Sequence, residues 1–326
     1  MLLQHAPVVL GNAAIAGKKE GEGPIGCWFD RIEEDDLLGR ESWEKAESQM
    51  FGDAVTLAAG KGGVRIDGID LLLGGDLLNQ IIAASFAARD LGLPYLGLYS
   101  ACATMSQSLL IGSLLIDGGG FGTVMCATSS HFCTAERQLR SPLEHGNVRP
   151  PTAQWTVTGA GATLLGKAGD GPRITSVTVG KPVDFGITDA NNMGAAMAPA
   201  AADTFMAHLY DTGRAVTDYD LIITGDLAAV GASLMLRLCQ EAGIGLTPPR
   251  YADCGVEIFA ANQNALSGGS GCGCSAVVLN GLYMNKLRAG EMRRILFIAT
   301  GALLSPTSTM QGESIPSVAH AVCLEA

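Results

Sequence analysis

Apolar and polar positions follow two different spacings along the chain. Between residues 42 and 59 the apolar positions, among them Ala46 and Met50, return every three or four residues. This spacing predicts an amphipathic helix that begins at the capping Ser42. A short apolar run over residues 69–75 ends in two glycines and predicts a buried strand. Because the two kinds of segment alternate, the pattern predicts an α/β fold around a buried sheet.

The same criteria predict most of the remaining elements. Strands are expected over residues 94–99, 122–130, 293–303 and 315–325, and helices over about 80–90, 102–117 and 197–210, with one more ending near 238. Pro199 is expected in the first turn of the third of these helices, where its missing N–H costs nothing.

One pattern occurs twice along the chain. The string DGIDLLLGGDLLN in the first half matches TDYDLIITGDLAA in the second. Asp70 corresponds to Asp220 and Asp76 to Asp226, each 150 positions later. A constant offset near half the chain length indicates two similar halves. The alternative is that an aliphatic run before a glycine turn is common in any α/β protein.

Composition and charge narrow the class of protein. Of 326 residues, 48% are hydrophobic and 16% charged, which indicates a well-buried chain without extensive disorder. The net charge of −11 and the absence of a basic run argue against a nucleic-acid partner and against direct binding to anionic lipid. No signal segment and no apolar run of membrane-spanning length are apparent, so we expect a soluble protein with its nine cysteines reduced.

Cys102, within SACATMSQSLL, is the strongest candidate for a reactive side chain. It directly precedes an apolar helical run, and a helix N-terminus favours a thiolate over a thiol. Three roles are open from the residues alone: a nucleophile for acyl transfer, a residue that lines a binding pocket, or a buried core cysteine.

Longer strings connect the chain with a known superfamily. TVTGAGATLLG and RRILFIATGALLS resemble strands of the thiolase-like superfamily, in particular of ketoacyl synthases. Further strings, including ATSSHFCTAERQLR, GITDANNMGAAMAPAAADT and GGSGCGCSAVV, resemble the dipicolinate-binding sporulation proteins of that superfamily, from about Pro7 to the C-terminus. The resemblance implies an α-β-α-β-α layered fold of two similar halves, residues 1–170 with Cys102 and residues 171–326, and a homodimer.

The resemblance also implies a function. It implies binding of dipicolinic acid, alone or as its calcium chelate, by a soluble protein peripherally associated with the spore inner membrane. There the protein would act with membrane channel subunits of the same operon to move dipicolinate into the forespore, with a connection to germination. The alternative functions are a condensing or acyl-transfer enzyme that uses Cys102, and a dimeric scaffold without a small ligand.

A catalytic role for Cys102 requires partners. In the initiating ketoacyl synthases a His and an Asn meet the cysteine, and by resemblance their positions fall on Thr224 and near Gly273. The five histidines stand at positions 5, 131, 145, 208 and 320, and none occupies either place. We therefore expect no enzyme activity and no catalytic residue.

The candidate ligand site is expected between the halves, as a compact polar pocket near Cys102. The expected ligand-binding residues are Cys102, Asp76, Ser129, His131, Arg137, Thr224, Asp226 and Ser270. Each has a simpler alternative: a surface histidine, arginine ion pairs with Glu136 or Glu144, or aspartates that cap helices. Arg140 and Lys181 are weaker candidates for binding the carboxylates. Cys272 and Cys274 lack a second pair at zinc spacing, and no cofactor fingerprint is present, so neither a metal site nor a cofactor is expected.

Overall fold

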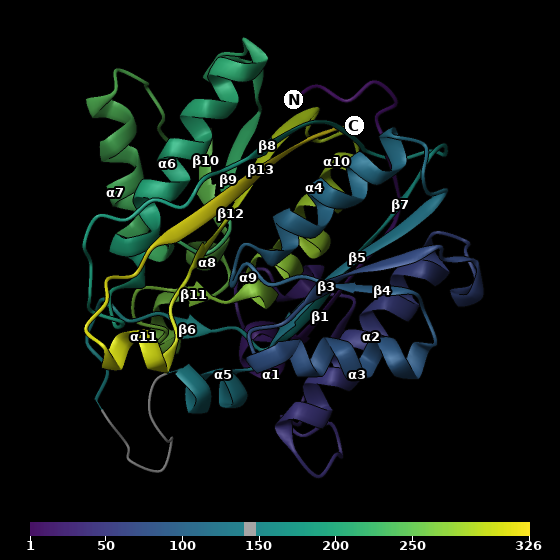
Figure 1. Ribbon diagram of the computed structural model, residues 1–326, viewed down its shortest axis with the longest axis horizontal. Helices are drawn as coiled ribbons and strands as arrows, with labels where there is room; N and C mark the ends of the chain where they lie inside the picture. The colour runs from purple at the N-terminus through teal and green to yellow at the C-terminus, as the bar shows by residue number, and fades with distance from the viewer. Residues whose placement is uncertain (140–147) are drawn as a thin grey trace.

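The computed structural model describes residues 1–139 and 148–326 (Figure 1). In the first part of the chain the strands are β1 (Val8–Gly17), β2 (Arg31–Glu33), β3 (Leu71–Gly75), β4 (Tyr95–Gly97), β5 (Thr123–Ser130), β6 (Trp155–Thr156) and β7 (Gly159–Gly166). The helices are α1 (Lys18–Gly21), α2 (Trp43–Lys61), α3 (Ile82–Leu91), α4 (Thr104–Asp117) and α5 (Phe132–Leu139).

The second part of the chain contains a similar set. Its strands are β8 (Arg173–Val179), β9 (Leu221–Thr224), β10 (Tyr251–Asp253), β11 (Gly269–Ser270), β12 (Arg294–Ala302) and β13 (Ser317–Glu325). Its helices are α6 (Met193–Thr212), α7 (Ala228–Glu241), α8 (Cys254–Glu257), α9 (Cys272–Val278), α10 (Met284–Arg288) and α11 (Pro306–Met310).

The large sheet has a mirrored strand order. It runs β10-β9-β12-β13-β8-β1-β7-β5-β3-β4, with β2 beside β1. From either edge inward, the first three strands pair in parallel with one another. Each of the next two strands pairs antiparallel with the strand before it. The two series meet where β1 pairs with β8 at a single position, Val8 with Arg173. The fold is thus the thiolase-like α/β fold that the resemblance implied.

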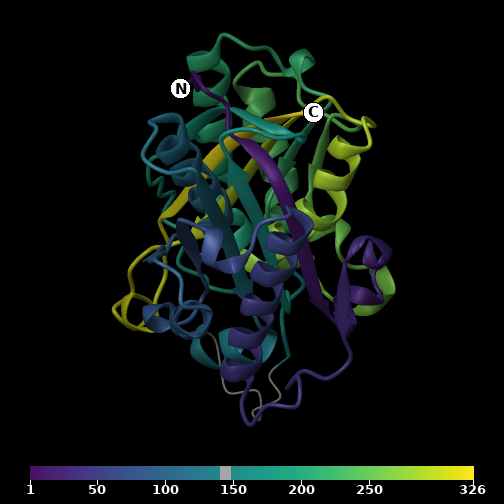
Figure 2. The ribbon, with the colours of Figure 1, turned by 90° about the vertical axis from the view of Figure 1, so that its right-hand side faces the viewer.

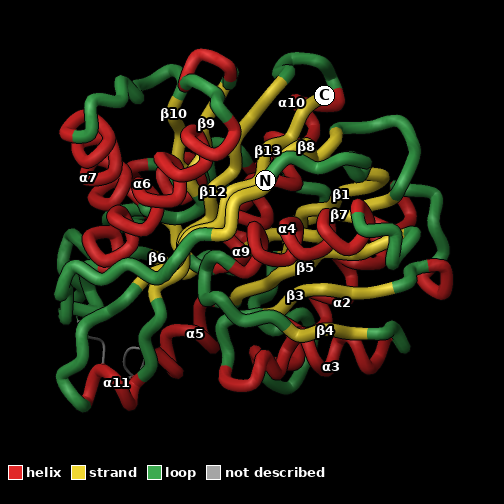
Figure 3. The backbone as a smooth tube through the Cα atoms, turned by 45° about the horizontal axis from the view of Figure 1, so that its top comes forward, coloured by secondary structure: helices red, strands yellow, loops and turns green. Residues whose placement is uncertain are grey.

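The helices form three layers around these strands. Helices α2 and α3 pack on the outer face of the first series, and α6 and α7 on the outer face of the second, as Figure 3 shows on opposite sides of the strands. Between them, α4 contacts strands of both series, while α9 contacts α4 and the strands of the first series. Apolar clusters fill each interface, the central one including Leu109, Val277 and Phe297. The central layer therefore brings the N-termini of α4 and α9 into the middle of the molecule.

Local sequence explains several of these elements. Ser42 caps α2 as predicted, because its hydroxyl accepts a hydrogen bond from the Lys45 amide at 3.3 Å. The prediction for Pro199 was wrong, since α6 begins at Met193 and Pro199 lies inside it. The extra turn at Met193 is fixed by packing: a Cβ on Gly194 would lie 2.8 Å from the Gly231 nitrogen of α7. Close helix packing of this kind outweighs the local preference of proline.

The two strands at the centre of the sheet carried no signal that we used. Figure 2 shows β1 crossing the middle of the molecule, and it pairs with β7 over its whole length. Strand β8 pairs with β13. The repeated aspartates take equivalent places: Asp70 directly precedes β3, and Asp220 directly precedes β9.

Candidate functional site

A small internal cavity lies beside Cys102, between the two series of strands. Its volume is about 30 Å³. The residues that line it are Leu77, Tyr99, Ala101, Cys102, Ala135, Glu136, Leu139, Thr156, Met193, Ser270, Gly271, Ala302 and Leu304. Thr156 and Ser270 come from β6 and β11, which pair as a separate two-stranded sheet across the halves. The cavity is compact as predicted, but its wall is mostly apolar rather than polar.

Cys102 lies in the turn before α4. Ala101 adopts a left-handed conformation, with φ 47°, and this places the cysteine two residues ahead of the helix. The Cys102 sulfur is 3.9 Å from the Ser270 hydroxyl oxygen, and the residue is buried. Burial raises the pKa of the thiol well above its ordinary value, and the nearby Asp226 carboxylate raises it further. The cost of desolvating a thiolate outweighs the stabilisation that the N-terminus of α4 would give it, so Cys102 is a neutral thiol.

Asp226 is the acidic group that adjoins Cys102. Its Oδ2 atom accepts hydrogen bonds from the Ser270 hydroxyl at 3.2 Å and from the Gly271 amide at 3.4 Å. Its Oδ1 atom is buried and has no hydrogen-bond partner among the described residues. Burial, the main cause, raises the pKa of Asp226 to about 7. Cys102, Asp226 and Ser270 thus form one cluster, in which Cys102 and Ser270 line the cavity and the fully buried Asp226 does not.

Thr224 does not line the cavity. Its hydroxyl group bonds to the Asp253 carboxylate at 2.6 Å and to the Tyr251 hydroxyl at 2.8 Å. Asp253, which the sequence analysis missed, also accepts the amides of Leu227 and Ala228 at the start of α7. The residue that approaches Cys102 from this strand end is therefore Asp226, two positions after Thr224. Its only sequence signal was the repeat with Asp76.

The expected asparagine position near Gly273 has no room for a side chain. A Cβ on Gly273 would lie 2.5 Å from the Ser130 hydroxyl and 2.6 Å from the Gly159 carbonyl oxygen. The preceding Cys272 packs in the same small apolar cluster as Cys102. Its thiol donates to the Ser129 carbonyl at 2.9 Å, which ties the start of α9 to the end of β5.

His131, Ser129 and Asp76 lie near this region but do not line the cavity. His131 is buried, with Nε2 donating to the Asp36 carbonyl at 2.9 Å and Nδ1 accepting from the Cys133 amide at 3.2 Å. Burial lowers its pKa, so the ring is neutral. His131 is therefore not the surface histidine of the simpler alternative. Both of its ring nitrogens are already hydrogen-bonded to the backbone, so neither is available for a ligand.

Asp76 caps a helix, which was the simpler alternative to a role in ligand binding. Its carboxylate accepts the Leu78 amide at 2.7 Å and the Ala84 amide at 2.8 Å, at the start of α3. The buried Glu47, which the sequence analysis missed, lies close to it and accepts the hydroxyl groups of Ser129 and Thr134 at 3.0 Å each. Burial and the Asp76 charge raise the pKa of Glu47, and burial raises that of Asp76.

The predicted cationic residues Arg137 and Lys181 do not line the cavity. Arg137 is half-exposed and pairs with Glu44, a surface ion pair of the kind that was its simpler alternative. Lys181 pairs with Asp203 at 3.1 Å. Arg140 and Glu144 lie outside the described residues. Among the described residues, Arg149 is a cation near the cavity wall, because it is 3.0 Å from Glu136, which lines the cavity.

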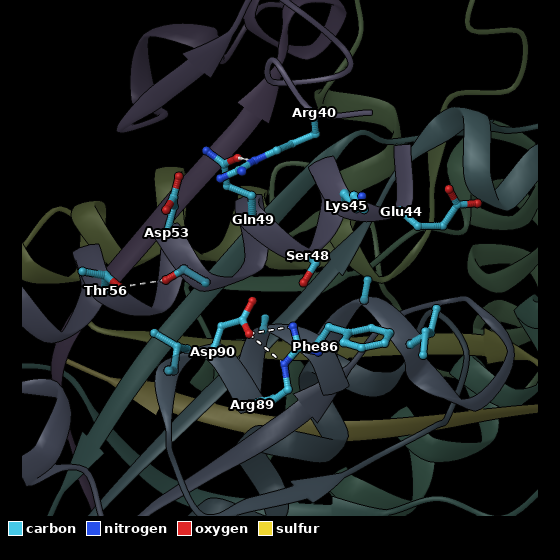
Figure 4. Close-up of a pocket in the computed structure, with 15 residues that line it drawn as sticks. Arg40, Glu44, Lys45, Ser48, Gln49, Asp53, Thr56, Phe86, Arg89 and Asp90 are labelled. Atoms are coloured by element: carbon cyan, nitrogen blue, oxygen red, sulfur yellow. Dashed lines mark hydrogen bonds and ion pairs between the residues drawn. The ribbon is translucent and has the colours of Figure 1, made fainter. Parts of the chain in front are cut away.

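A larger hollow, about 680 Å³, lies between α2 and α3 on the outer face (Figure 4). Its charged side chains mostly have partners at the surface: Arg89 pairs with Asp90 at 2.7 Å, and Arg40 donates to Gln49. No buried polar group without a partner adjoins it among the described residues. The convergent chemistry is therefore at Cys102 rather than in this larger hollow.

Residues 1–139 and 148–326 contain no cluster of three or more His, Cys, Asp or Glu side chains arranged to hold a metal ion. Nor do they include a helix long and apolar enough to cross a membrane.

Comparison with known proteins decides the family. The family model described as Stage V sporulation protein AD matches residues 1–325. The chain belongs to the stage V sporulation protein AD family. Stage V sporulation protein AD of Bacillus subtilis (strain 168) is 45% identical over 324 residues, which are 99% of this chain and 96% of that protein.

Solved structures support the fold of this stage V sporulation protein AD family member. The 3-oxoacyl-[acyl-carrier-protein] synthase III of Aquifex aeolicus superposes with a TM-score of 0.61 at 14% identity, over 98% of this chain and 100% of that one. Acetamide-bound OleA of Xanthomonas campestris gives 0.62 at 17% identity, over 99% and 100%. At this low identity the likeness concerns the fold alone.

Proposed function

We propose that the chain binds dipicolinic acid in the Cys102 cavity and acts as a binding protein rather than as a catalyst. The family resemblance suggests the ligand. The observation that carries the proposal is the Asp226 Oδ1 atom, which is buried without a partner beside Cys102 and Ser270. A buried polar atom without a partner costs free energy, which a ligand group at hydrogen-bond distance would recover.

The chemistry of the cluster favours binding over acyl transfer. A nucleophilic cysteine needs a thiolate and a proton acceptor. Here burial and the Asp226 charge hold Cys102 as the thiol. No histidine or asparagine lines the cavity among the described residues. The apolar part of the wall suits the face of a pyridine ring, which stacks and packs without hydrogen bonds.

A dicarboxylate needs compensating charge in this cavity. No lysine or arginine is among the described residues that line it, and Glu136 is acidic. Asp226, with a pKa of about 7, supplies one solution because its protonated form donates to a ligand carboxylate. The second solution is entry of the ligand as its calcium chelate, in which Ca²⁺ neutralises the two carboxylates.

The cellular part of the proposal rests on the family. The chain would associate peripherally with the spore inner membrane and present dipicolinate to channel subunits of the same operon in the forespore. We also propose a homodimer. Strand β4 is the last strand of the sheet, and Leu96 on it is 52% exposed. Unpaired sheet edges of this kind are commonly covered by a second copy.

Calorimetric titration with dipicolinate, with and without Ca²⁺, tests the binding function on the natural chain and on Cys102→Ala. Saturable binding that survives loss of the thiol supports a binding protein. An acyl adduct on Cys102 from an acyl-thioester offered in parallel would favour a condensing or acyl-transfer enzyme. Failure to bind dipicolinate with retained binding to the channel subunits would favour a scaffold. Light scattering after gel filtration tests the homodimer.

A further inference from the structure

A second hollow adjoins the Cys102 cavity on its outer side. It has a volume of about 260 Å³ and is lined in part by Asn79, Gln80 and Gln138. Tyr99, Leu139 and Leu304 line both this hollow and the inner cavity. These three side chains therefore form the wall between the two spaces.

The inner cavity is too small for an aromatic ligand unless the wall residues move. At about 30 Å³, it has room for about two water molecules. A pyridine ring with two carboxyl groups is several times larger than that. A ligand of this size reaches Cys102 and Asp226 only if the wall moves and the two spaces join.

The three wall residues come from three separate segments of the chain. Leu139 is the last residue of α5, and Leu304 lies in the segment between β12 and α11. Tyr99 is 47% exposed, yet burial and the nearby Cys102 raise its pKa to about 12. Because Tyr99 lines both the outer hollow and the inner cavity that contains Cys102, it lies between the two spaces. None of the three belongs to a strand of the large sheet, and the buried Leu304 packs in the apolar cluster that includes residues of α6 and β12.

The outer hollow has a different character from the inner cavity. Asn79 and Gln80 line it, and their side-chain amides can donate to carboxylates. Gln138 also lines it, but its Nε2 donates to the Leu77 carbonyl at 3.1 Å and its Oε1 accepts the Asn79 amide at 2.9 Å. Gln80 and Ile81 both have left-handed backbones, with φ 57° and 47°. Such conformations cost free energy in residues other than glycine and occur often where a segment serves a ligand. A polar entrance thus precedes a mostly apolar inner wall.

We propose that the outer hollow is the entrance to the Cys102 site and that Tyr99, Leu139 and Leu304 are its gate. The ligand class is a flat aromatic carboxylate: the ring passes the gate into the apolar cavity, and a carboxylate on the outer side meets the amides of the hollow. The identity of the ligand rests on the proposed function, but the gate itself does not.

Alkylation of Cys102 by iodoacetamide, followed by peptide mass spectrometry, tests the gate without the ligand. The sulfur displaces iodide and its proton passes to the buffer. If the open form is a minor state, Tyr99→Ala and Leu304→Ala are expected to accelerate the reaction at least about tenfold. Tyr210→Ala, which removes an 88% exposed tyrosine of α6, is the matched control and should change nothing.

Two further features keep this test decisive. Cys27 is exposed and should react at the same rate in every variant, so a change there reports general unfolding. Leu304→Phe narrows the gate and should slow the reaction of Cys102, the opposite of the alanine effect. Equal Cys102 rates in the natural chain, both alanine variants and Leu304→Phe would overturn the gate.

Binding kinetics separate the gate from the proposed function. By stopped-flow, Tyr99→Ala should raise the association and dissociation rates of dipicolinate together and change the dissociation constant less than either rate. If the natural chain does not bind dipicolinate, the proposed function fails, while the alkylation result still decides the gate. If dipicolinate binds but neither alkylation nor rates respond, the gate fails alone.

Discussion

Asp76 and Asp226 occupy matching positions of the sequence repeat but have opposite surroundings. Each lies just after a strand and a glycine turn, β3 and β9 respectively, and each is fully buried. Both carboxylate oxygens of Asp76 accept backbone amides of its own half, from Leu78 and Ala84. Asp226 keeps one oxygen without a partner and directs the other to Ser270 and Gly271.

The difference depends on a third aspartate. In the second half Asp253 accepts the amides of Leu227 and Ala228, the role that Asp76 performs for α3. Because Asp253 in β10 accepts the amides at the start of α7, the Asp226 carboxylate is not needed there and can adjoin Cys102. The comparison teaches that equivalent residues of a repeat diverge when a neighbour takes over the structural hydrogen bonds, and that the released residue becomes available for a ligand.

The largest expected effect is on ligand affinity at Asp226. Asp226→Ala should weaken dipicolinate binding about a hundredfold, because it removes the buried Oδ1 atom that lacks a partner in the cluster around Cys102. If the protonated carboxyl donates to the ligand, the natural chain binds best below its pKa of about 7 and loses up to about tenfold per pH unit above it. Calorimetry from pH 6 to pH 8.5 measures both effects.

Asp226→Asn is the control for this mechanism. The amide donates at every pH, so its affinity should stay constant across the range in which the natural chain declines. A natural chain with a flat pH profile, or an alanine variant with unchanged affinity, would show that Asp226 does not contact the ligand.

The sequence was sufficient for the fold because the fold depends on local patterns. Helical spacing found α2 and α4, and apolar runs before glycines found β3 and β9. The central strands β1 and β8 were not predicted. The β-branched residues of RITSVTV in β8 were a strand signal left unused, and the places of both strands in the sheet depend on pairing with distant strands. The limits of α6 likewise depended on its contact with α7 through Gly194 and Gly231.

The site was predicted only where position along the chain determines it. Cys102, Ser270 and Asp226 meet because strand ends and helix starts converge at the middle of the fold. Thr224 was expected to face Cys102, but β9 ends at Thr224 and the chain bends at residues 225–226, so that Asp226 rather than Thr224 adjoins Cys102. Asp253 and Arg149 were missed because their partners, Leu227 and Glu136, are remote in sequence and no local pattern marks them.

A smaller but clear effect is expected on stability at Asp76. Asp76→Ala leaves the buried amides of Leu78 and Ala84 without acceptors, and should lower the free energy of unfolding by about 2–4 kcal/mol. Asp226→Ala should cost markedly less, because it deprives only one backbone amide, from Gly271, of its acceptor. Urea unfolding followed by circular dichroism measures both variants, and equal losses would contradict the assignment of a structural role to one aspartate and a ligand role to the other.

The smallest effect is expected where the repeat has not diverged. Asp70 accepts the amides of Gly122 and Thr123, each at 2.8 Å, and Asp220 accepts those of Arg293 and Arg294. These backbone hydrogen bonds lower the pKa of both carboxyls. Asp70→Asn and Asp220→Asn should therefore cost the same small amount at pH 7, about 1 kcal/mol or less at such exposed sites.

The pH dependence of this pair has a definite sign. Because the folded pKa values lie below the ordinary 3.8, the stabilisation is present above that value and is lost as the pH falls through the folded pKa. Each asparagine variant should consequently approach the natural chain in stability when urea unfolding is repeated in strongly acidic buffer. A large difference between Asp70→Asn and Asp220→Asn at pH 7 would mean that this position, like that of Asp76 and Asp226, has also diverged between the halves.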